Sequence, residues 1–214
     1  MKTIIIVPWF NYWKTPNYEE FSYLINSIKK EGYNVQIFDY ETHPEDLEDL
    51  LERLHTFINS LKIKEYTLIG YSLGSYLSVL YSQKFKDKRL KQMILCCPLL
   101  LGSKLFKSFY IIWPNWKKHS GKVIHDATYK RLDFNKIPKN IEVGVIRGEK
   151  RINRRLISLF AQLIIKGKND GLFEVSESEF GSNKITLPIG HYDGMHSEIL
   201  AETIKKFLKN SSFD

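Results

Sequence analysis

Residues 66–74 read YTLIGYSLG, and they set the interpretation of the whole chain. The first five residues suit a strand that is buried on both faces, and an apolar helical stretch runs from Leu73 to about Phe85. Between them lies the pattern G-x-S-x-G, with Ser72 at its centre. Chance alone produces this pattern in about one chain in twenty of this size. The pattern is therefore informative mainly because it lies between a predicted strand and a predicted helix.

The same alternation of strand and helix continues along the chain. Short apolar runs predict strands at residues 3–7, 34–40, 66–70, 91–98, 141–149 and 184–190. One-sided apolar stripes predict helices at residues 18–31, 45–62, 73–85, 152–166 and 197–209. Such alternation is typical of an α/β fold, and we expect about six mostly parallel strands with helices on both faces. Functional residues are then expected at the carboxyl ends of the strands.

Several residues that could perform acyl transfer follow predicted strands. Ser72 stands where a tight turn would expose a nucleophile, and the N–H of Leu73 would point at an oxyanion from the start of a helix. His191 follows the last strand and is the candidate base, with His196 as the alternative. The acid could be Glu149, directly after a strand, or Asp170, in a polar turn, and position alone does not separate them.

At this level of detail the chain resembles an α/β-hydrolase. It is similar to the lipase and esterase branch that includes small bacterial lipases and GPI inositol-deacylase-like proteins. The specific parts are the stretch TLIGYSLGSYLSVLYSQKF, which matches the nucleophile elbow and its helix, and NDGLFEVSES, which resembles the segment that carries the acid. The resemblance implies Ser72 as nucleophile, Asp170 as acid and His191 as base, in the chain order of these hydrolases.

The resemblance also implies an oxyanion hole and a cap. Phe10 would supply a second N–H to the oxyanion, beside that of Leu73, although Trp9 stands where the family usually has a glycine. Residues 99–139 interrupt the strand–helix alternation and are rich in aromatic residues and lysine, without a clean period. We expect one α/β-hydrolase domain over residues 1–214, with a cap excursion at about 99–139.

Composition restricts the partners. The 214 residues carry a formal net charge of +8, but the lysines are scattered, so we expect no nucleic-acid site and at most a weak contact with a membrane surface or anionic lipid. The two adjacent cysteines, Cys96 and Cys97, lie in an apolar run and cannot form a four-ligand zinc site, and neither a metal nor an organic cofactor is expected. No apolar run reaches the length of a signal-peptide core or a membrane span, which predicts a cytoplasmic protein.

These observations predict a serine hydrolase that cleaves small carboxylic esters through an acyl-enzyme. The alternatives are a thioesterase and a hydrolase-fold protein with weak catalysis that serves in binding. The departure at Trp9 and the open choice of the acid motivate the binding alternative. No motif in the sequence indicates the oligomeric state or the length of the acyl chain.

Overall fold

The computed structural model describes residues 2–9, 17–40, 46–113, 115–152 and 156–214. Six strands form one sheet in the order β2-β1-β3-β4-β5-β6, and every neighbouring pair is parallel. This confirms the predicted fold class. The strands are β1 (Thr3–Val7), β2 (Asn34–Ile37), β3 (Tyr66–Tyr71), β4 (Leu90–Cys96), β5 (Glu142–Gly148) and β6 (Lys184–Leu187).

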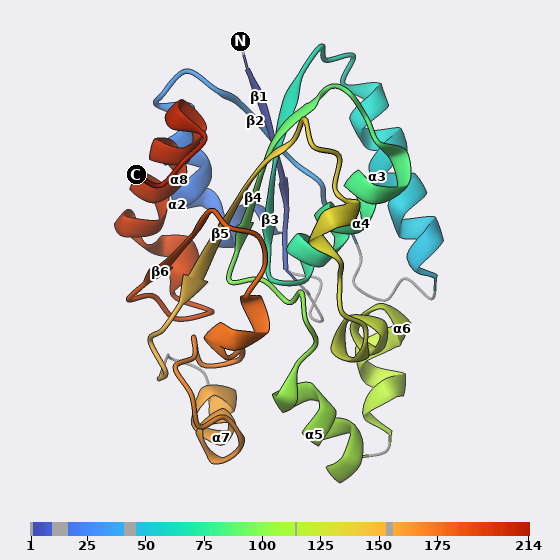
Figure 1. Cartoon of the computed structure of the whole chain (residues 1–214), viewed down its shortest axis with the longest axis vertical. Helices are drawn as coiled ribbons and strands as arrows, with labels where there is room; N and C mark the ends of the chain where they lie inside the picture. The colour runs from blue at the N-terminus through green and yellow to red at the C-terminus, as the bar shows by residue number, and fades with distance from the viewer. Residues whose placement is uncertain (1, 10–16, 41–45, 114, 153–155) are drawn as a thin grey trace.

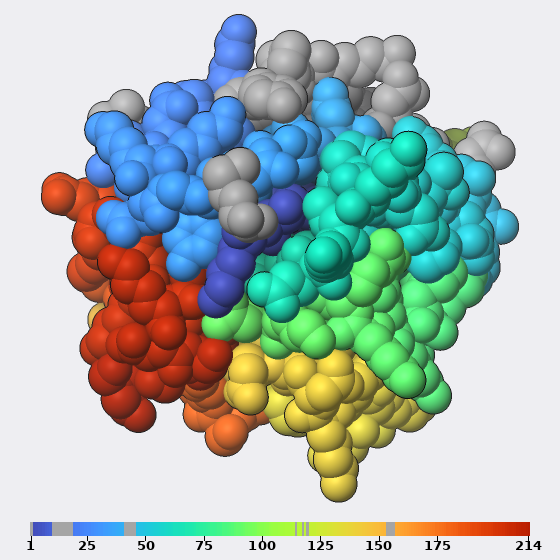
Figure 2. All heavy atoms as spheres, turned by 90° about the horizontal axis from the view of Figure 1, so that it is seen from above, coloured from blue at the N-terminus to red at the C-terminus, as the bar shows by residue number. Residues whose placement is uncertain are grey.

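Helices cover both faces of this sheet, as the alternation predicts. On one face, α2 (Ser22–Lys29) and α8 (Glu198–Asn210) lie side by side (Figures 1 and 2). On the other face lie α3 (Leu47–Ser60) and α4 (Leu73–Phe85) (Figure 1). The helix predicted over residues 18–31 is divided in two, because α1 (Asn17–Glu20) ends before Phe21, whose buried ring packs edge-on against Tyr71.

The sheet separates two apolar cores, which explains the continuous apolar runs of its strands. In β1, Ile4 and Ile6 face α2 and α8, whereas Ile5 and Val7 face α3 and α4. All four side chains are fully buried. A strand with both faces covered needs apolar residues at every position, so the pattern that identified these strands is a direct consequence of the layered packing.

The remaining helices gather beyond the carboxyl ends of the strands (Figure 1). They are α5 (Lys104–Ile112), α6 (Trp116–Tyr129) and α7 (Leu156–Ile164), with the short 3₁₀ turns η2 (Val175–Ser178) and η3 (Gly194–His196). A further 3₁₀ turn, η1 (Phe134–Lys136), lies beside α4, where the Gln83 side chain donates to the carbonyl of Asp133. The sequence predicted α7 but neither α5 nor α6. In α5 only Leu105 is buried, and α6 is kinked at Gly121, which has a φ of 76°, so neither helix shows a regular apolar stripe.

The order of the strands fixes where a site can form. The chain moves from β1 to β2 on one side and then returns to place β3 on the other side of β1. Crossover helices therefore leave in opposite directions from β1 and β3, which opens a crevice at the carboxyl ends of these two strands. Trp9 and Ser72 lie just beyond these ends. No helix in the described part of the chain is both long and apolar enough to span a membrane.

Candidate active site

Ser72 lies on a sharp turn between β3 and α4. Its backbone has φ 54° and ψ −117°, a region that residues other than glycine rarely occupy, and its N–H donates to the carbonyl of Cys96 at 2.9 Å. The flanking glycines are required by space. A Cβ on Gly74 would overlap the carbonyl oxygen of Val7, and a Cβ on Gly70 would lie 2.6 Å from the Cα of Ser75. The G-x-S-x-G pattern thus permits a close approach of α4 to β1 and β3 that holds the Ser72 hydroxyl at the carboxyl edge.

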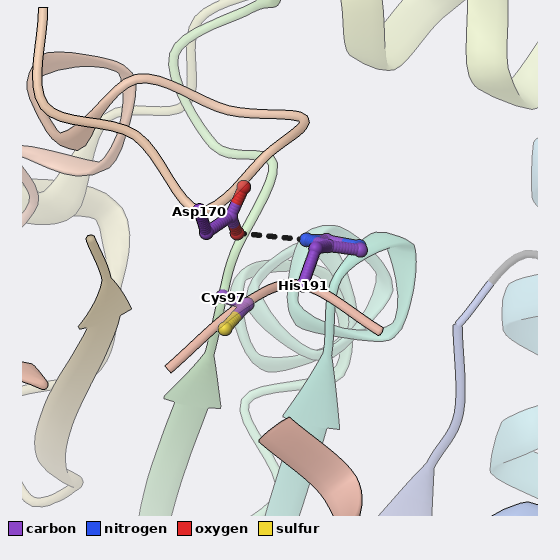
Figure 3. A group of neighbouring side chains, drawn as sticks. All are labelled: Cys97, Asp170 and His191. Atoms are coloured by element: carbon purple, nitrogen blue, oxygen red, sulfur yellow. Dashed lines mark hydrogen bonds and ion pairs between the residues drawn. The ribbon is translucent and has the colours of Figure 1, made fainter. Parts of the chain in front are cut away.

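His191 connects Ser72 to Asp170. The Nε2 atom of His191 lies 3.0 Å from the Ser72 Oγ, and its Nδ1 lies 2.8 Å from the Asp170 Oδ2. The imidazole–carboxylate contact is drawn in Figure 3. The backbone N–H of His191 also donates to the carbonyl oxygen of Asp170 at 2.7 Å, so the two segments are joined twice. All three side chains are buried, which removes competing water from these contacts.

The turn Asn169–Phe173 fixes the orientation of the Asp170 carboxylate. Its Oδ1 accepts the backbone N–H groups of Leu172 at 2.9 Å and Phe173 at 2.8 Å, which leaves Oδ2 directed at the imidazole. Gly171 has a φ of 98°, a left-handed conformation that favours glycine, and the Asn169 side chain accepts its N–H. The sequence N-D-G therefore builds a turn in which one carboxylate oxygen is held by the backbone and the other remains for His191.

The two alternative residues lie elsewhere. Glu149 forms an ion pair with Lys168 at 2.8 Å, and its side chain is about one-third exposed. His196 is exposed in η3, where its backbone N–H donates to the carbonyl of Asp193. The structure therefore brings Asp170 rather than Glu149 to His191, and His191 rather than His196 to Ser72.

Tyr71 holds the loop of His191, a contact that the sequence analysis did not identify. Its hydroxyl donates to the His191 carbonyl at 2.8 Å, and its ring meets the imidazole edge-on at 5.9 Å. Burial raises the pKa of the Tyr71 phenol well above its ordinary value, so the hydroxyl remains a donor. The sequence did contain a signal for this contact, because Tyr71 lies within G-x-S-x-G at the end of a buried strand. A tyrosine hydroxyl that is buried at such a position requires a hydrogen-bond partner.

Trp9 is also part of the surroundings of His191. Its ring lies roughly parallel to the imidazole, with the ring centres 6.3 Å apart and an angle of 27°, and its edge meets Tyr192. Trp9 thus forms a wall of the site. Of the two residues assigned to an oxyanion hole, Leu73 is the first residue of α4, where helical N–H groups lack partners within the helix. Phe10 lies outside the described residues.

Cys97 approaches the same carboxylate from β4 (Figure 3). Its Sγ, an oxygen of Asp170 and a ring nitrogen of His191 lie within 4.8 Å of one another, a spacing that could hold a metal ion. The chemistry does not fit such a site. Burial raises the pKa of the Cys97 thiol well above its ordinary value, whereas a metal ligand must be a thiolate, and the Nδ1 of His191 is already engaged with Asp170.

A small apolar cavity of about 60 Å³ opens beside the Ser72 hydroxyl. Residues from the strand ends and from the helices beyond them share its wall. They are Trp9, Ser72, Leu73, Leu99, Phe106, Ile124, Leu172, His191 and Tyr192. Ser72 is only 6% exposed and His191 only 1%, so both side chains lie below the molecular surface, at the wall of this cavity.

Comparisons with known proteins agree with this fold. The model of the alpha/beta hydrolase fold family matches residues 12–128. The chain is similar in structure to a bromoperoxidase from Bacillus anthracis, with 14% identity and a TM-score of 0.66 over 98% of this chain and 92% of that one. It is also similar to an esterase from Exiguobacterium antarcticum, with 16% identity and a TM-score of 0.63 over 98% and 92%.

A lipase-esterase related protein from Clostridium acetobutylicum is similar as well, with 16% identity and a TM-score of 0.59 over 98% of this chain and 93% of that one. At these identities the structural likeness concerns the fold alone. No curated protein matches the chain.

Proposed function

The chain belongs to the alpha/beta hydrolase fold family, and we propose that it is a serine hydrolase that cleaves carboxylic esters through an acyl-enzyme. The observation that carries the proposal is the pair of contacts made by one imidazole. His191 lies 3.0 Å from the Ser72 hydroxyl and 2.8 Å from the Asp170 carboxylate. A nucleophile, a base and an orienting acid in this arrangement are the parts that acyl transfer requires.

In the proposed reaction, the Ser72 Oγ attacks the carbonyl carbon of the ester while its proton passes to the Nε2 of His191. The imidazolium then gives this proton to the departing alkoxide, which leaves as an alcohol, and the acyl group stays on Ser72. Water attacks the acyl-enzyme with the same imidazole as base, which releases the carboxylic acid and restores Ser72. Asp170 accepts the Nδ1–H throughout, and so keeps the tautomer in which Nε2 can take a proton.

The negative charge that develops on the carbonyl oxygen needs donors. We assign one to the N–H of Leu73, at the start of α4, where the partial positive charge of the helix adds to the donor. Phe10 is proposed as the second donor, on the family resemblance alone. One such donor contributes about 3–4 kcal/mol to lowering the barrier.

The cavity beside Ser72 supports a short acyl group. Its volume of about 60 Å³ corresponds to about four to five water-sized spheres, which suits an acyl chain of about two to four carbons. Phe106 and Ile124, from α5 and α6, close this space. We therefore interpret residues 99–139 as a cap that limits acyl length.

Hydrolysis of p-nitrophenyl esters from acetate to decanoate tests the proposal. We expect turnover with the acetate and butyrate esters, a loss of at least about a hundredfold in kcat/KM at decanoate, and no turnover for Ser72→Ala. A matched series of thioesters separates an esterase from a thioesterase. Folded wild-type protein without turnover on either series would contradict the proposal and favour a binding role.

A further inference from the structure

An apolar surface lies exposed on the two helices α5 and α7. It consists of Ile111, Ile112, Trp113, Leu159, Phe160 and Leu163, and we call it the α5–α7 face. Ile111 is 80% exposed and Leu163 is 70% exposed, values that are unusual for aliphatic side chains on two neighbouring helices. Exposed apolar side chains gathered on two packed helices indicate a contact with another molecule or with a membrane.

The helix α7 exposes Leu159, Phe160 and Leu163, whereas its Ile157 and Ile164 are partly buried against the core. Its sequence LISLFAQLI contains no charged residue, and the residues fully buried beneath it are the small Ser158 and Ala161. Leu159 and Leu163, four residues apart on one side of the helix, are more than half exposed. An ordinary surface helix has charged or polar residues on the side that faces away from the core. The outer side of α7 is therefore suited to an apolar environment.

Aromatic contacts join the two helices into one surface. Phe109 of α5 stacks on Phe160 of α7, with ring centres 5.5 Å apart and an angle of 18°. Phe109 also meets Trp116, which in turn lies against Trp113. Both helices lie beyond the carboxyl ends of the strands (Figure 1), and Phe106, on the inner side of α5, lines the cavity beside Ser72. The α5–α7 face is thus the outer side of the structure that covers the candidate active site.

Along the sequence, the excess of positive charge is concentrated in the two segments that contain α5 and α7. Residues 104–122 and 150–168 together contain eleven lysines and arginines and no aspartate or glutamate. The rest of the chain holds 21 basic and 24 acidic residues, so it is slightly negative although the whole protein has a net charge of +8. Ion pairs to acids outside these segments engage Lys104, Lys150 and Lys168. Lys118, in α6, and Lys166, two residues after the end of α7, are exposed.

We propose that the α5–α7 face docks on a lipid surface that carries anionic headgroups. Exposed apolar side chains on two helices that lie in basic segments match such a surface, which offers hydrocarbon below a layer of negative charge. A second copy of the chain fits less well, because two faces of the same positive charge repel each other. Nucleic acid would match the charge but would leave Ile111 and Leu163 without an apolar partner. Docking in this way places the covered side of the Ser72 site against the lipid.

Co-sedimentation with vesicles tests the proposal without reference to hydrolysis. The protein is mixed with vesicles of phosphatidylcholine, alone or with an equal share of phosphatidylglycerol. We expect binding to the anionic vesicles to be about tenfold stronger or more, and to weaken between 100 mM and 500 mM salt. The double variant Ile111→Ser and Leu163→Ser should reduce this binding about tenfold or more. The control Ile199→Ser, at an exposed position of α8, should change it less than about twofold.

A second pair of variants isolates the charge. Lys118→Glu with Lys166→Glu should weaken binding to anionic vesicles about tenfold or more, whereas Lys64→Glu with Lys88→Glu, equally exposed but on loops outside the two basic segments, should have a much smaller effect. The proposal is overturned if both pairs of charge variants reduce vesicle binding equally, or if the protein binds vesicles equally well with and without anionic lipid. So would a dimer in analytical ultracentrifugation that Leu163→Ser dissociates. Vesicle binding by a protein without esterase turnover would refute only the proposed function.

Discussion

Replacing Asp170 with asparagine should remove most of the activity while leaving the geometry of the site intact. The Oδ1 of Asp170 accepts two backbone N–H groups, from Leu172 and Phe173, and this pairing should keep the amide oxygen of the asparagine in the same place. The amide nitrogen would then face the Nδ1 of His191, where Oδ2 now lies at 2.8 Å. Because an amide nitrogen only donates, Nδ1 would have to accept, and the proton would move to Nε2.

An imidazole that carries its proton on Nε2 cannot take one from Ser72. The expected loss in kcat/KM is about 10³- to 10⁴-fold, which corresponds to about 4–5.5 kcal/mol of barrier. Stability should change much less, because both backbone hydrogen bonds persist. The assay is hydrolysis of p-nitrophenyl butyrate under kcat/KM conditions, with the unfolding midpoint measured on the same preparations.

Glu149→Gln is the matched control. It breaks a partly exposed ion pair with Lys168, a contact with a free energy of at most about 1 kcal/mol, and should leave kcat/KM within about twofold. The reasoning is refuted if Asp170→Asn keeps more than a tenth of the activity. It is also refuted if Glu149→Gln loses several orders of magnitude while Asp170→Asn does not.

Three further variants test other contacts. Gly74→Ala should lower the free energy of unfolding in urea by about 3 kcal/mol or more, because its Cβ would overlap the carbonyl of Val7. The control Gly32→Ala has a φ of +83° and open space around it, and should lose only about 1–2 kcal/mol. Equal losses in the two variants would contradict this steric argument. Tyr71→Phe leaves the His191 carbonyl without its donor and should lower kcat about tenfold at an unchanged KM; an unchanged kcat would remove Tyr71 from a positioning role. Asp87→Asn should cost about 1–2 kcal/mol near neutral pH. Burial alone would raise the pKa of Asp87, but hydrogen bonds from Arg89 and Tyr66 hold this pKa below its usual value of 3.8. The carboxylate therefore stabilises the fold fully above pH 3.8, and this stabilisation is lost as the pH falls through the lower pKa of the folded state. A difference from wild type that does not narrow in acid would show that the carboxylate charge is not responsible.

The elements that sequence predicted best are those whose side chains face only one kind of environment. The strands are covered on both faces, so a run such as Thr3–Val7 is apolar throughout and its limits coincide with the predicted ones. The turn at Ser72 could be predicted equally well from the sequence, because steric contact allows only glycine at positions 70 and 74. Local sequence therefore carries most of the information about the sheet and the elbow.

The parts that sequence did not resolve depend on contacts between distant segments. Glu149 and Asp170 both follow β5, and only the turn at Gly171 shows which carboxylate is turned toward His191. Likewise α5 and α6 were not predicted, since their apolar residues are divided between the core, the cavity and an exposed face, which removes any single periodicity. The two basic segments are also far apart in the sequence, and only the packing of α5 against α7 brings their helices together.

Labelling with a fluorophosphonate tests the central proposal most directly, because the probe reacts with a serine only when a base activates it. Mass spectrometry of the labelled protein should show one added phosphonyl group on the peptide that contains Ser72, with labelling abolished in Ser72→Ala and His191→Ala. Failure of the folded wild-type protein to react, under conditions that label a known esterase, would contradict the account. Labelling that persists in Ser72→Ala would contradict it as well.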